Sequence, residues 1–490
     1  MRELDINSIR YYMNWMNGQK GWDYRPYSRL TETYKRERPY ICRMEPEMNG
    51  CIIDWFDNGD PDAAHSAAFR RRGKEDDTAV IKNAGTSVAI KNLRPDTEYE
   101  AWIYRSANPE MRSDKRLFRT GKYPGKIINY LHPNDNAYYF SGSYLCDPFI
   151  LRTGTGRLLV SMSAYNNHKN QNLSFIFKSD DEGESWQYLC ELMPCFWGKM
   201  FCHKNRVYML SITNEYGHAV LGYSEDDGEH WSQPVIIFPG SGNYSREPGM
   251  HTSPGRVCCY KGRIWTAMEY GMWALGFHDS AVISVSEDAD LMNGENWIMS
   301  DLLRFDTEWE GACKEGALNF IEGNVIAGPD NVLYNILRNN NNNNNGQIHE
   351  NLGKAVMLKI DADNPEKKQE FAAIIDFNGG SSKFVIDRDE ETGVYYSIVN
   401  RVTNPAYTRQ RNIASLAVSK DLRQWKIVKD LLDASDESPD ETGFQYIVHI
   451  PARSDLLYVS RTACNHAHNF HDSNCITFHK VADFRRLLEM

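Results

Sequence analysis

The chain carries one eight-residue stretch twice: Ser179-Asp180-Asp181-Glu182-Gly183-Glu184-Ser185-Trp186 returns as Ser224-Glu225-Asp226-Asp227-Gly228-Glu229-His230-Trp231. Short Asp and Ser side chains bond nearby backbone amides in tight turns. Glycine supplies a positive φ without a Cβ clash. The Trp that ends each copy opens the next strand and can pack against the neighbouring sheet. Both copies therefore predict a hairpin turn between two β-strands.

Two weaker copies follow. Ser286-Glu287-Asp288 reaches Gly294-Glu295-Asn296-Trp297 after a small insertion, and the copy at 419–425 is one residue short and lacks the glycine. The spacing is roughly that of four-stranded propeller blades, about 40 to 50 residues. The repeat resembles the Asp-box of sialidases and related β-propeller proteins. This resemblance implies an all-β fold with a six-bladed β-propeller over residues 123–490.

Strand-like runs in residues 123–490 form six clusters, as six blades require. Each cluster contains an apolar run typical of a blade strand, namely 158–162, 206–210, 263–267, 332–337, 394–398 and 456–459. We expect the run at 127–130 to supply the strand that closes the ring. The asparagine run at 339–345 predicts a low-complexity loop that is mobile and forms no site.

Residues 39–122 form a separate unit of alternating strands. Runs such as 51–55 and 66–70 lead to a corner around Tyr99, and Arg119-Thr120-Gly121 closes the unit. This pattern resembles a fibronectin type III module, which implies a β-sandwich in which Tyr99 bonds back to the loop backbone. We expect residues 1–38 to be a strap or linker, with a short helix near 11–16.

Composition limits the class of protein. A chain of 490 residues exceeds what one core usually supports, and 41% hydrophobic and 25% charged residues are typical of soluble globular proteins. The net charge of −11 argues against a nucleic-acid or anionic-membrane partner. The start of the chain lacks an apolar signal-peptide core, so we expect a cytoplasmic protein. The 11 cysteines include no C-x-x-C pair, which indicates neither a disulfide framework nor a zinc ribbon.

The resemblance to sialidases implies a site at one mouth of the propeller, where the first strand of each blade begins. As a family, sialidases use three arginines for the substrate carboxylate, an Asp acid/base, and a Tyr nucleophile activated by a Glu. In the stretch that matches the first arginine motif, Cys146 replaces the arginine before Asp147-Pro148. Because a carboxylate clamp uses the guanidinium fork, Cys146 argues against a standard sialidase. Asp147 is an acid/base candidate or a sugar-hydroxyl acceptor; the alternative is a turn cap before Pro148.

Blade four matches the family pattern better. Ile321-Glu322-Gly323 and the hairpin that ends in Arg338 resemble the family's strand with its Glu and its second Arg. The resemblance implies that Glu322 activates a nucleophile or acts as a base and that Arg338 contacts substrate; a structural ion pair is the alternative. At the start of blade six, either Phe444 or Tyr446 occupies the place of the nucleophilic Tyr.

Other polar and aromatic residues fall at the same mouth. The substrate-binding candidates that precede blades two, three and five are Trp197, a possible sugar-stacking platform, with Lys199, Arg246, His251 and Lys383. In the segment 465–474, His471 is a candidate for sugar binding or proton transfer. His466 and His468 alternate as metal ligands could, but a metal needs further ligands, and we expect neither a metal nor another cofactor.

These features favour an exo-acting, sialidase-like glycoside hydrolase with a carbohydrate substrate, in which Glu322 and Asp147 form the carboxylate pair. Carboxyl groups about 5 Å apart predict retention of configuration, and groups roughly 6.5 to 9.5 Å apart predict inversion. One alternative is a polysaccharide lyase for a uronate-containing glycan, with His251 or His471 acting beside Tyr446. Another is a non-catalytic glycan-binding propeller. The sugar, the linkage and the oligomeric state stay open.

Overall fold

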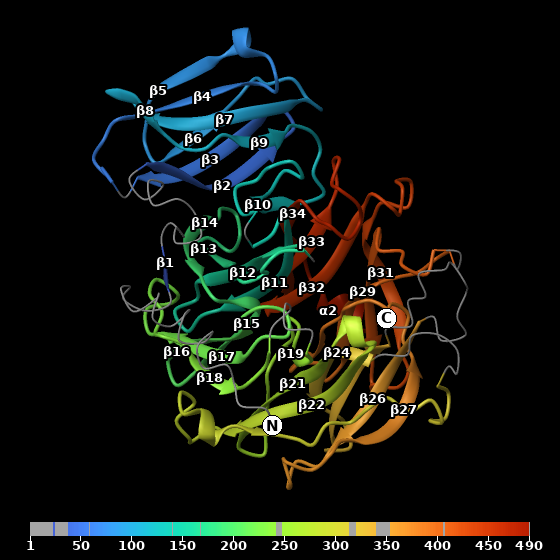
Figure 1. The fold of residues 1–490 in the computed structure, drawn as a ribbon. Coiled ribbons are helices and arrows are strands. Elements are labelled where there is room, and N and C mark those ends of the chain that lie inside the picture. Colours follow the sequence, from blue (N-terminus) through green and yellow to red (C-terminus); the bar gives the residue numbers. More distant parts are fainter. Residues whose placement is uncertain are drawn as a thin grey trace.

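The computed structural model describes residues 23–24, 38–57, 59–139, 141–166, 168–241, 247–312, 320–339, 353–404 and 407–489. In these ranges the strands form two sheets of an N-terminal β-sandwich and six sheets of a β-propeller (Figure 1). The predicted all-β fold is confirmed. The helix expected near 11–16, most of the asparagine run and Arg246 lie outside the described residues.

The N-terminal sandwich packs two small sheets around a core that includes Met44, Trp55 and Phe118. One sheet contains β2 (Pro39–Glu47), β3 (Gly50–Asp57) and β6 (Ser87–Ile90), and the other contains β4 (His65–Arg71), β5 (Ala79–Ala84), β7 (Glu98–Arg105), β8 (Asn108–Arg112) and β9 (Arg116–Arg119). The backbone N–H of Arg94 donates to Tyr99 Oη over 3.0 Å, which is the corner bond expected from the sequence. The likeness to fibronectin type III and the exact domain boundaries stay predictions.

The first three blades occupy the left and lower parts of the ring in Figure 1. Blade one contains β11 (Tyr144–Arg152), β12 (Leu158–Tyr165), β13 (Ser174–Ser179) and β14 (Gln187–Leu192), with β1 (Asp23–Tyr24) added at its edge. Blade two contains β15 (Phe196–His203), β16 (Arg206–Ile212), β17 (Ala219–Ser224) and β18 (Val235–Phe238). Blade three contains β19 (Gly249–His251), β20 (Cys258–Tyr260), β21 (Arg263–Met272), β22 (Phe277–Ser286) and β23 (Ile298–Met299).

The last three blades complete the ring. Blade four contains β24 (Phe320–Ala327), β25 (Leu333–Asn339), β26 (Lys354–Ile360) and β27 (Glu370–Asp376), and blade five contains β28 (Ile386–Arg388), β29 (Tyr395–Asn400), β30 (Ile413–Ser419) and β31 (Lys426–Asp433). Blade six contains β32 (Gly443–Ala452), β33 (Asp455–Ala463) and β34 (Cys475–Val481), and the short helix α2 (Arg485–Leu488) follows. β10 (Lys126–Tyr130) pairs with β34, so the strand expected to close the ring does so.

The repeated stretches form the same turn twice, between the third and fourth strands of blades one and two. Ser179 Oγ accepts from the N–H of Gly183 over 2.9 Å, and Ser224 Oγ accepts from the N–H of Gly228 over 2.8 Å. Both glycines have positive φ, 91° and 88°. A Cβ on Gly183 would lie 2.3 Å from the ring of Phe478 in blade six. The turn thus packs its blade against the preceding one.

The sandwich and the propeller share buried contacts. Tyr40 Oη donates to Glu191 Oε1 over 2.7 Å, and Arg43 Nε donates to the carbonyl of Ile128 over 2.9 Å. The apolar core of the sandwich continues into Ile127, Tyr130 and residues of blade six. Figure 1 shows the sandwich above the ring, beside β10 and β14. The two units therefore form one continuous body.

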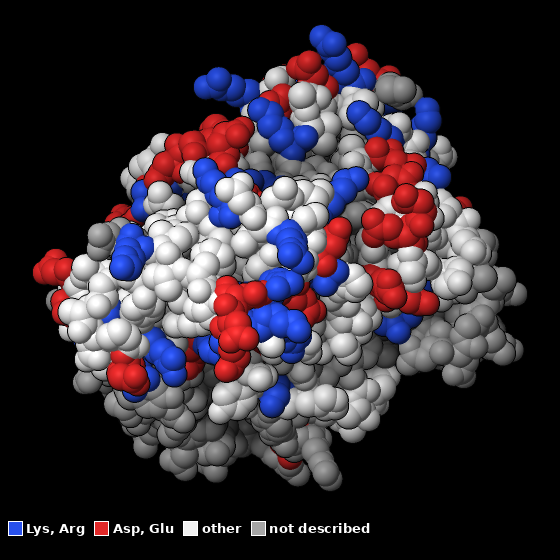
Figure 2. Space-filling model, turned by 90° about the horizontal axis from the view of Figure 1, so that it is seen from above, with Lys and Arg blue, Asp and Glu red and all other residues white. Residues whose placement is uncertain are grey.

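The surface carries charges of both signs. On the face seen in Figure 2, acidic and basic side chains alternate without a continuous basic area, in line with the net charge of −11. Among the residues that the structure describes, no helix has the length and apolar character needed to cross a membrane.

Candidate active site

Four blades carry the same irregularity in their first strand. Cross-strand pairing slips by one residue at a bulge in β11, β15, β24 and β32. In each bulge a non-glycine residue has a positive φ: 41° at Asp147, 51° at Trp197, 61° at Glu322 and 52° at Tyr446. Bulges re-aim side chains, and such backbone conformations cost about 1 to 3 kcal/mol each and cluster at functional sites. The four residues are therefore structurally equivalent functional candidates.

Tyr446 and Glu322 meet in the central channel. Tyr446 Oη donates a hydrogen bond to Glu322 Oε1 over 2.6 Å. Their strands, β32 and β24, belong to blades six and four, which are not neighbours, so the two side chains can meet only across the channel. Arg338 at the end of β25 donates from Nη1 to Glu322 Oε2 over 3.0 Å. The structure thus brings together three residues that the sequence indicated.

The charges around this contact favour an ionised Glu322 and a protonated Tyr446. Burial raises the pKa of Glu322, but Arg338 and Lys383 outweigh it and the net pKa is lowered. Burial, with the nearby Glu322 carboxylate, raises the pKa of Tyr446 above its ordinary value. Glu322 is therefore the acceptor in this bond, and Tyr446 is the donor.

Phe444 and Tyr446 lie in different surroundings because of the bulge in β32. Phe444 packs in the apolar core that it shares with Ile447 and with strands of blade five. Tyr446 instead leaves the strand at the bulge and reaches Glu322. Simple alternation places both residues on one strand face, and the positive φ at Tyr446 breaks that alternation.

Two arginines that the sequence analysis did not select lie beside Tyr446. The guanidinium of Arg461 stands 5.3 Å from the centre of the Tyr446 ring and 4.9 Å from that of Tyr165. Arg461 pairs with the residue before the bulge in β32, just as Arg338 does in blade four. Arg411, before β30, donates to the side chain of Gln445. Arg461 has the same pairing position in blade six as Arg338 has in blade four, and only this equivalence could have indicated Arg461.

Arg411 and Arg461 have no carboxylate partner among the residues that the structure describes. Each is 2% exposed, and the Nε atom of each is buried without a hydrogen bond. Burial, together with the nearby charge of Arg338, lowers the pKa of Arg411 to about 9. Because buried charges are normally paired, these two guanidinium groups are available to bind an anionic group.

Asp147 offers a second carboxyl group. It is 1% exposed, and Ser163 Oγ donates to its Oδ2 over 2.6 Å. Its Oδ1 has no hydrogen-bond partner in the described part of the chain. Burial raises the pKa of Asp147 to about 6, although Ser163 and Arg461 oppose this shift. A carboxyl group of this kind holds a proton close to neutral pH.

Trp197 and His251 form a buried aromatic wall beside Asp147. The ring of Trp197 stacks on Phe196 at 5.2 Å and meets the edge of His251 at 4.3 Å. Trp197 is only 5% exposed, so its ring offers no open face to a sugar. Its backbone N–H instead lies near the Asp147 carboxyl group and opposes the rise that burial causes in its pKa. His251 Nδ1 lies 2.9 Å from Glu269 Oε2.

The two candidate lysines are buried in the channel. Lys383 Nζ donates to the carbonyl of Phe384 over 2.6 Å, and Lys199 Nζ donates to Thr266 Oγ1 over 3.0 Å. Burial lowers the pKa of Lys383 to about 8 and that of Lys199 to about 7, although Glu269 opposes both shifts. Lys383 stabilises the negative charge of Glu322. The bond of Lys199 goes to Thr266 and reaches neither Tyr446 nor Glu322.

His471 supports the site from the loop after β33. Its carbonyl accepts from Arg461 Nη2 over 2.6 Å, and its Nδ1 lies 3.0 Å from Asp472 Oδ1. Burial and Arg461 lower the pKa of His471 to about 3, so the ring is neutral near pH 7. No group of three or more His, Cys, Asp or Glu side chains in the described residues is placed to hold a metal ion.

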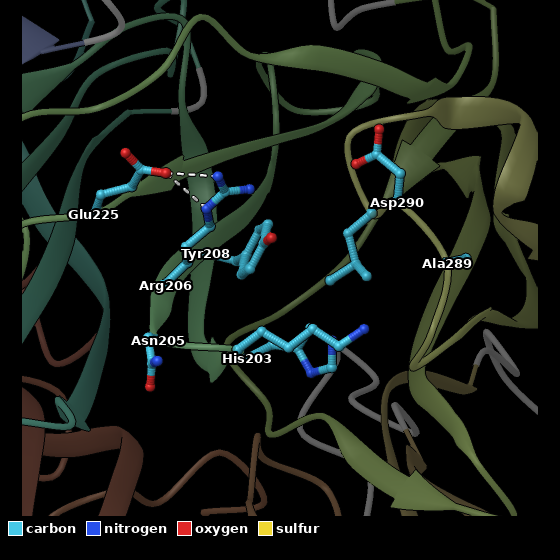
Figure 3. Close-up of a pocket in the computed structure, with 9 residues that line it drawn as sticks. His203, Asn205, Arg206, Tyr208, Glu225, Ala289 and Asp290 are labelled. Carbon is cyan, nitrogen blue, oxygen red and sulfur yellow. Dashed lines mark hydrogen bonds and ion pairs between the residues drawn. The ribbon is translucent and has the colours of Figure 1, made fainter.

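A separate hollow of about 400 Å³ lies at the far end of blade two, away from these residues (Figure 3). His203, Tyr208 and Asp290 line it, and Arg206 in its wall is paired with Glu225 over 2.9 Å. It contains none of the four bulge residues. We therefore place the candidate site in the channel.

Comparisons with solved structures found propellers at low sequence identity. A leech intramolecular trans-sialidase is 10% identical with a TM-score of 0.49, over 93% of this chain and 93% of that one. A Penicillium chrysogenum α-L-arabinanase is 12% identical with a TM-score of 0.48, over 74% and 98%. An intramolecular trans-sialidase from Ruminococcus gnavus is 11% identical with a TM-score of 0.47, over 74% and 97%. No protein-family model matches the chain. No curated protein matches it either.

Proposed function

We propose that this protein is a retaining, exo-acting glycoside hydrolase that removes a terminal acidic sugar from a glycan. The observation that carries the proposal is the 2.6 Å hydrogen bond from Tyr446 to Glu322 across the channel. A buried Tyr hydroxyl bonded to an ionised carboxylate is a nucleophile with its base already in place. A sialidase-like hydrolase with a Tyr nucleophile uses the same pair of a Tyr hydroxyl and a carboxylate base.

The reaction uses two covalent steps. Tyr446 Oη attacks the anomeric carbon while its proton passes to Glu322, and Asp147 donates a proton to the departing glycosidic oxygen. Asp147, now ionised, then takes a proton from water, whose oxygen displaces Tyr446 from the sugar. Tyr446 recovers its proton from Glu322, so each group returns to its starting state. Two displacements at one carbon retain its configuration.

The acidic character of the sugar follows from the unpaired arginines. Arg411 and Arg461 are both 2% exposed and make no ion pair with a described carboxylate, whereas Arg338 is paired with Glu322. A carboxylate on the substrate would supply the missing partner and accept the guanidinium fork. Cys146, fully buried, stands in the place of the family's first arginine. We therefore propose that Arg461, from blade six, provides the positive charge that Cys146 cannot provide. We also propose that the substrate differs from that of a standard sialidase.

Glu322 and Asp147 both keep a role in this proposal: Asp147 is the acid, but Glu322 is not the nucleophile. Glu322 already bonds Tyr446 and Arg338, so its oxygens face those partners. Tyr446 is then the group left to form the covalent bond. Glu322 acts through Tyr446, and Asp147 acts on the leaving group.

A lyase that removes a proton next to a uronate carboxylate is the second candidate. The same buried arginines would bind the uronate, and Tyr446 would act as the base. Of the two histidines considered for this reaction, His251 lies 2.9 Å from Glu269. His471 is bonded to Asp472, and its pKa is lowered to about 3, which makes it a weak base. The unsaturated uronate made by a lyase absorbs in the ultraviolet, and the saturated sugar released by a hydrolase from an unlabelled glycan does not.

The test is a screen of 4-methylumbelliferyl glycosides of acidic and neutral sugars, with product absorbance followed in parallel. We expect release from an acidic glycoside, and we expect Tyr446→Phe and Glu322→Gln each to lower kcat by about 100-fold or more. Tyr458→Phe is the matched control, because Tyr458 is a buried tyrosine stacked on His479 in the outer part of blade six. Cleavage of neutral glycosides alone, or an unsaturated product, would contradict the proposal.

A further inference from the structure

One large aromatic side chain at the mouth stays open to solvent. Trp273 follows β21 in the hairpin between the second and third strands of blade three, and it is 44% exposed. The aromatic rings closer to the reacting centre are covered: Trp197 and Tyr446 are each 5% exposed, and Tyr165 is 7% exposed. Trp273 therefore offers an exposed ring face at the edge of a site whose inner aromatic rings are buried.

Trp273 is held in place by its neighbours. Its side chain opposes the effect of burial on the pKa of the Glu215 carboxyl group, and Gln171 Nε2 donates to that group over 2.8 Å. The backbone N–H of Trp273 donates to Tyr216 Oη over 3.0 Å. Its ring stands edge-on to His278 at 4.6 Å. A ring fixed in this way loses little conformational freedom when a ligand packs on it.

A chain of aromatic contacts joins Trp273 to the proposed acid. Ring centres are 4.6 Å apart from Trp273 to His278, 4.8 Å from His278 to His251, and 4.3 Å from His251 to Trp197. Trp197 lies beside Asp147, and its backbone N–H opposes the rise that burial causes in the pKa of that carboxyl group. Because the acid protonates the leaving oxygen, the leaving group departs along the wall next to Asp147. That wall leads to Trp273.

The charge of this wall differs from that of the opposite side. The unpaired arginines, Arg411 and Arg461, come from blades five and six, whereas the wall from Trp197 to Trp273 comes from blades two and three. Glu215 is a buried carboxyl group bonded to Gln171, and burial raises its pKa. Lys199 of blade two has no ion pair, but it donates to Thr266 Oγ1 over 3.0 Å, and burial lowers its pKa to about 7, which favours its neutral form. The wall fits the apolar face and hydroxyl groups of an uncharged sugar.

We propose that Trp273 forms the subsite for a neutral sugar on the leaving-group side, so that the substrate is an acidic sugar linked to a neutral glycan. The inference rests on the proposed hydrolase function and extends it. Apolar faces of sugar rings pack on aromatic rings, and the contacts of Trp273 with Tyr216 and His278 hold the ring that receives them.

The experiment compares two substrates of the acidic sugar that the screen identifies. One is its glycosyl fluoride, which has no leaving-group sugar, and the other is the same sugar linked to lactose. We expect Trp273→Ala to lower kcat/KM for the lactose glycoside about tenfold or more and to leave the fluoride within about twofold. Trp273→Phe should recover part of the loss, because it keeps an aromatic face.

Leu275→Ala is the matched control, since Leu275 lies in the same hairpin and is 50% exposed. We expect it to retain the activity of the unchanged protein on both substrates. Equal activity of Trp273→Ala on the lactose glycoside would overturn the subsite and leave the hydrolase proposal standing. Equal losses on both substrates would also overturn it, because they indicate a disturbed hairpin. If the unchanged protein cleaves neither substrate, the proposed function fails and the subsite fails with it.

Discussion

Asp147 shows how one buried residue links catalysis and stability. Free aspartate has a pKa of about 3.9, whereas burial raises the pKa of Asp147 to about 6. A group that must donate a proton is active while it is protonated. We therefore expect kcat/KM to fall as pH rises through about 6. In Asp147→Asn this limb of the pH profile should disappear, with activity on poor leaving groups lowered by about 100-fold or more.

The same shift predicts a pH-dependent change in stability. A carboxyl group whose folded pKa is raised stabilises the fold below the unfolded pKa, and this contribution is lost as pH rises through the folded pKa of about 6. Asp147→Asn cannot ionise, so its melting temperature relative to the unchanged protein should be higher at pH 8 than at pH 4. A difference that is the same at both pH values would show that Asp147 does not titrate in this way.

At the scale of strands, the bulges position the site. In β24 the bulge at Glu322 is followed by Gly323, where a Cβ would lie 2.2 Å from Asn335 Oδ1 and 2.8 Å from the Ala267 Cβ. Gly323→Ala should therefore move Glu322 and lower the free energy of unfolding by about 1 to 3 kcal/mol. Enzyme assays and chemical denaturation measure both effects.

The matched control for this strand is Gly154→Ala in blade one. No atom lies within 4 Å of a Cβ built on Gly154, and its φ is not in the left-handed region. We expect Gly154→Ala to retain activity and stability. Similar losses in the two variants would mean that the packing of the bulge in β24 is unimportant.

The sequence predicted turns better than bulges. The Ser-Asp-Gly-Trp repeat predicts a turn because each residue type has a local bonding role, and the turn bonds of Ser179 and Ser224 match. The bulge residues share a register position but no residue type, so no motif shows their equivalence. Arg461 was missed for this reason. It takes the position in β33 that Arg338 takes in β25, and this equivalence is visible only once the two strands are aligned.

At the scale of the whole molecule, the sandwich and the propeller should unfold together, because their apolar core is continuous. Arg116 in β9 pairs with Asp135 before blade one over 2.5 Å, and both side chains are at most 4% exposed. Arg116→Ala leaves a buried carboxylate unpaired and should cost about 3 to 5 kcal/mol. Calorimetry should show one transition, at a lower temperature in the variant.

The control for this contact is Arg72→Ala, which breaks a pair with Glu98 at the surface of the sandwich. The side chains of that pair are 39% and 33% exposed, so the expected cost is at most about 1 kcal/mol. Two separate calorimetric transitions in the unchanged protein would contradict the shared core.

The covalent role of Tyr446 can be measured by mass spectrometry. The protein is treated with a glycosyl fluoride of the released acidic sugar that carries a second fluorine beside the anomeric carbon, and is then digested. Because that fluorine slows the second displacement, we predict one added sugar on the peptide that contains Tyr446, and none in Tyr446→Phe. An active enzyme that carries the sugar on Glu322 or Asp147, or that forms no adduct, would contradict a Tyr446 nucleophile.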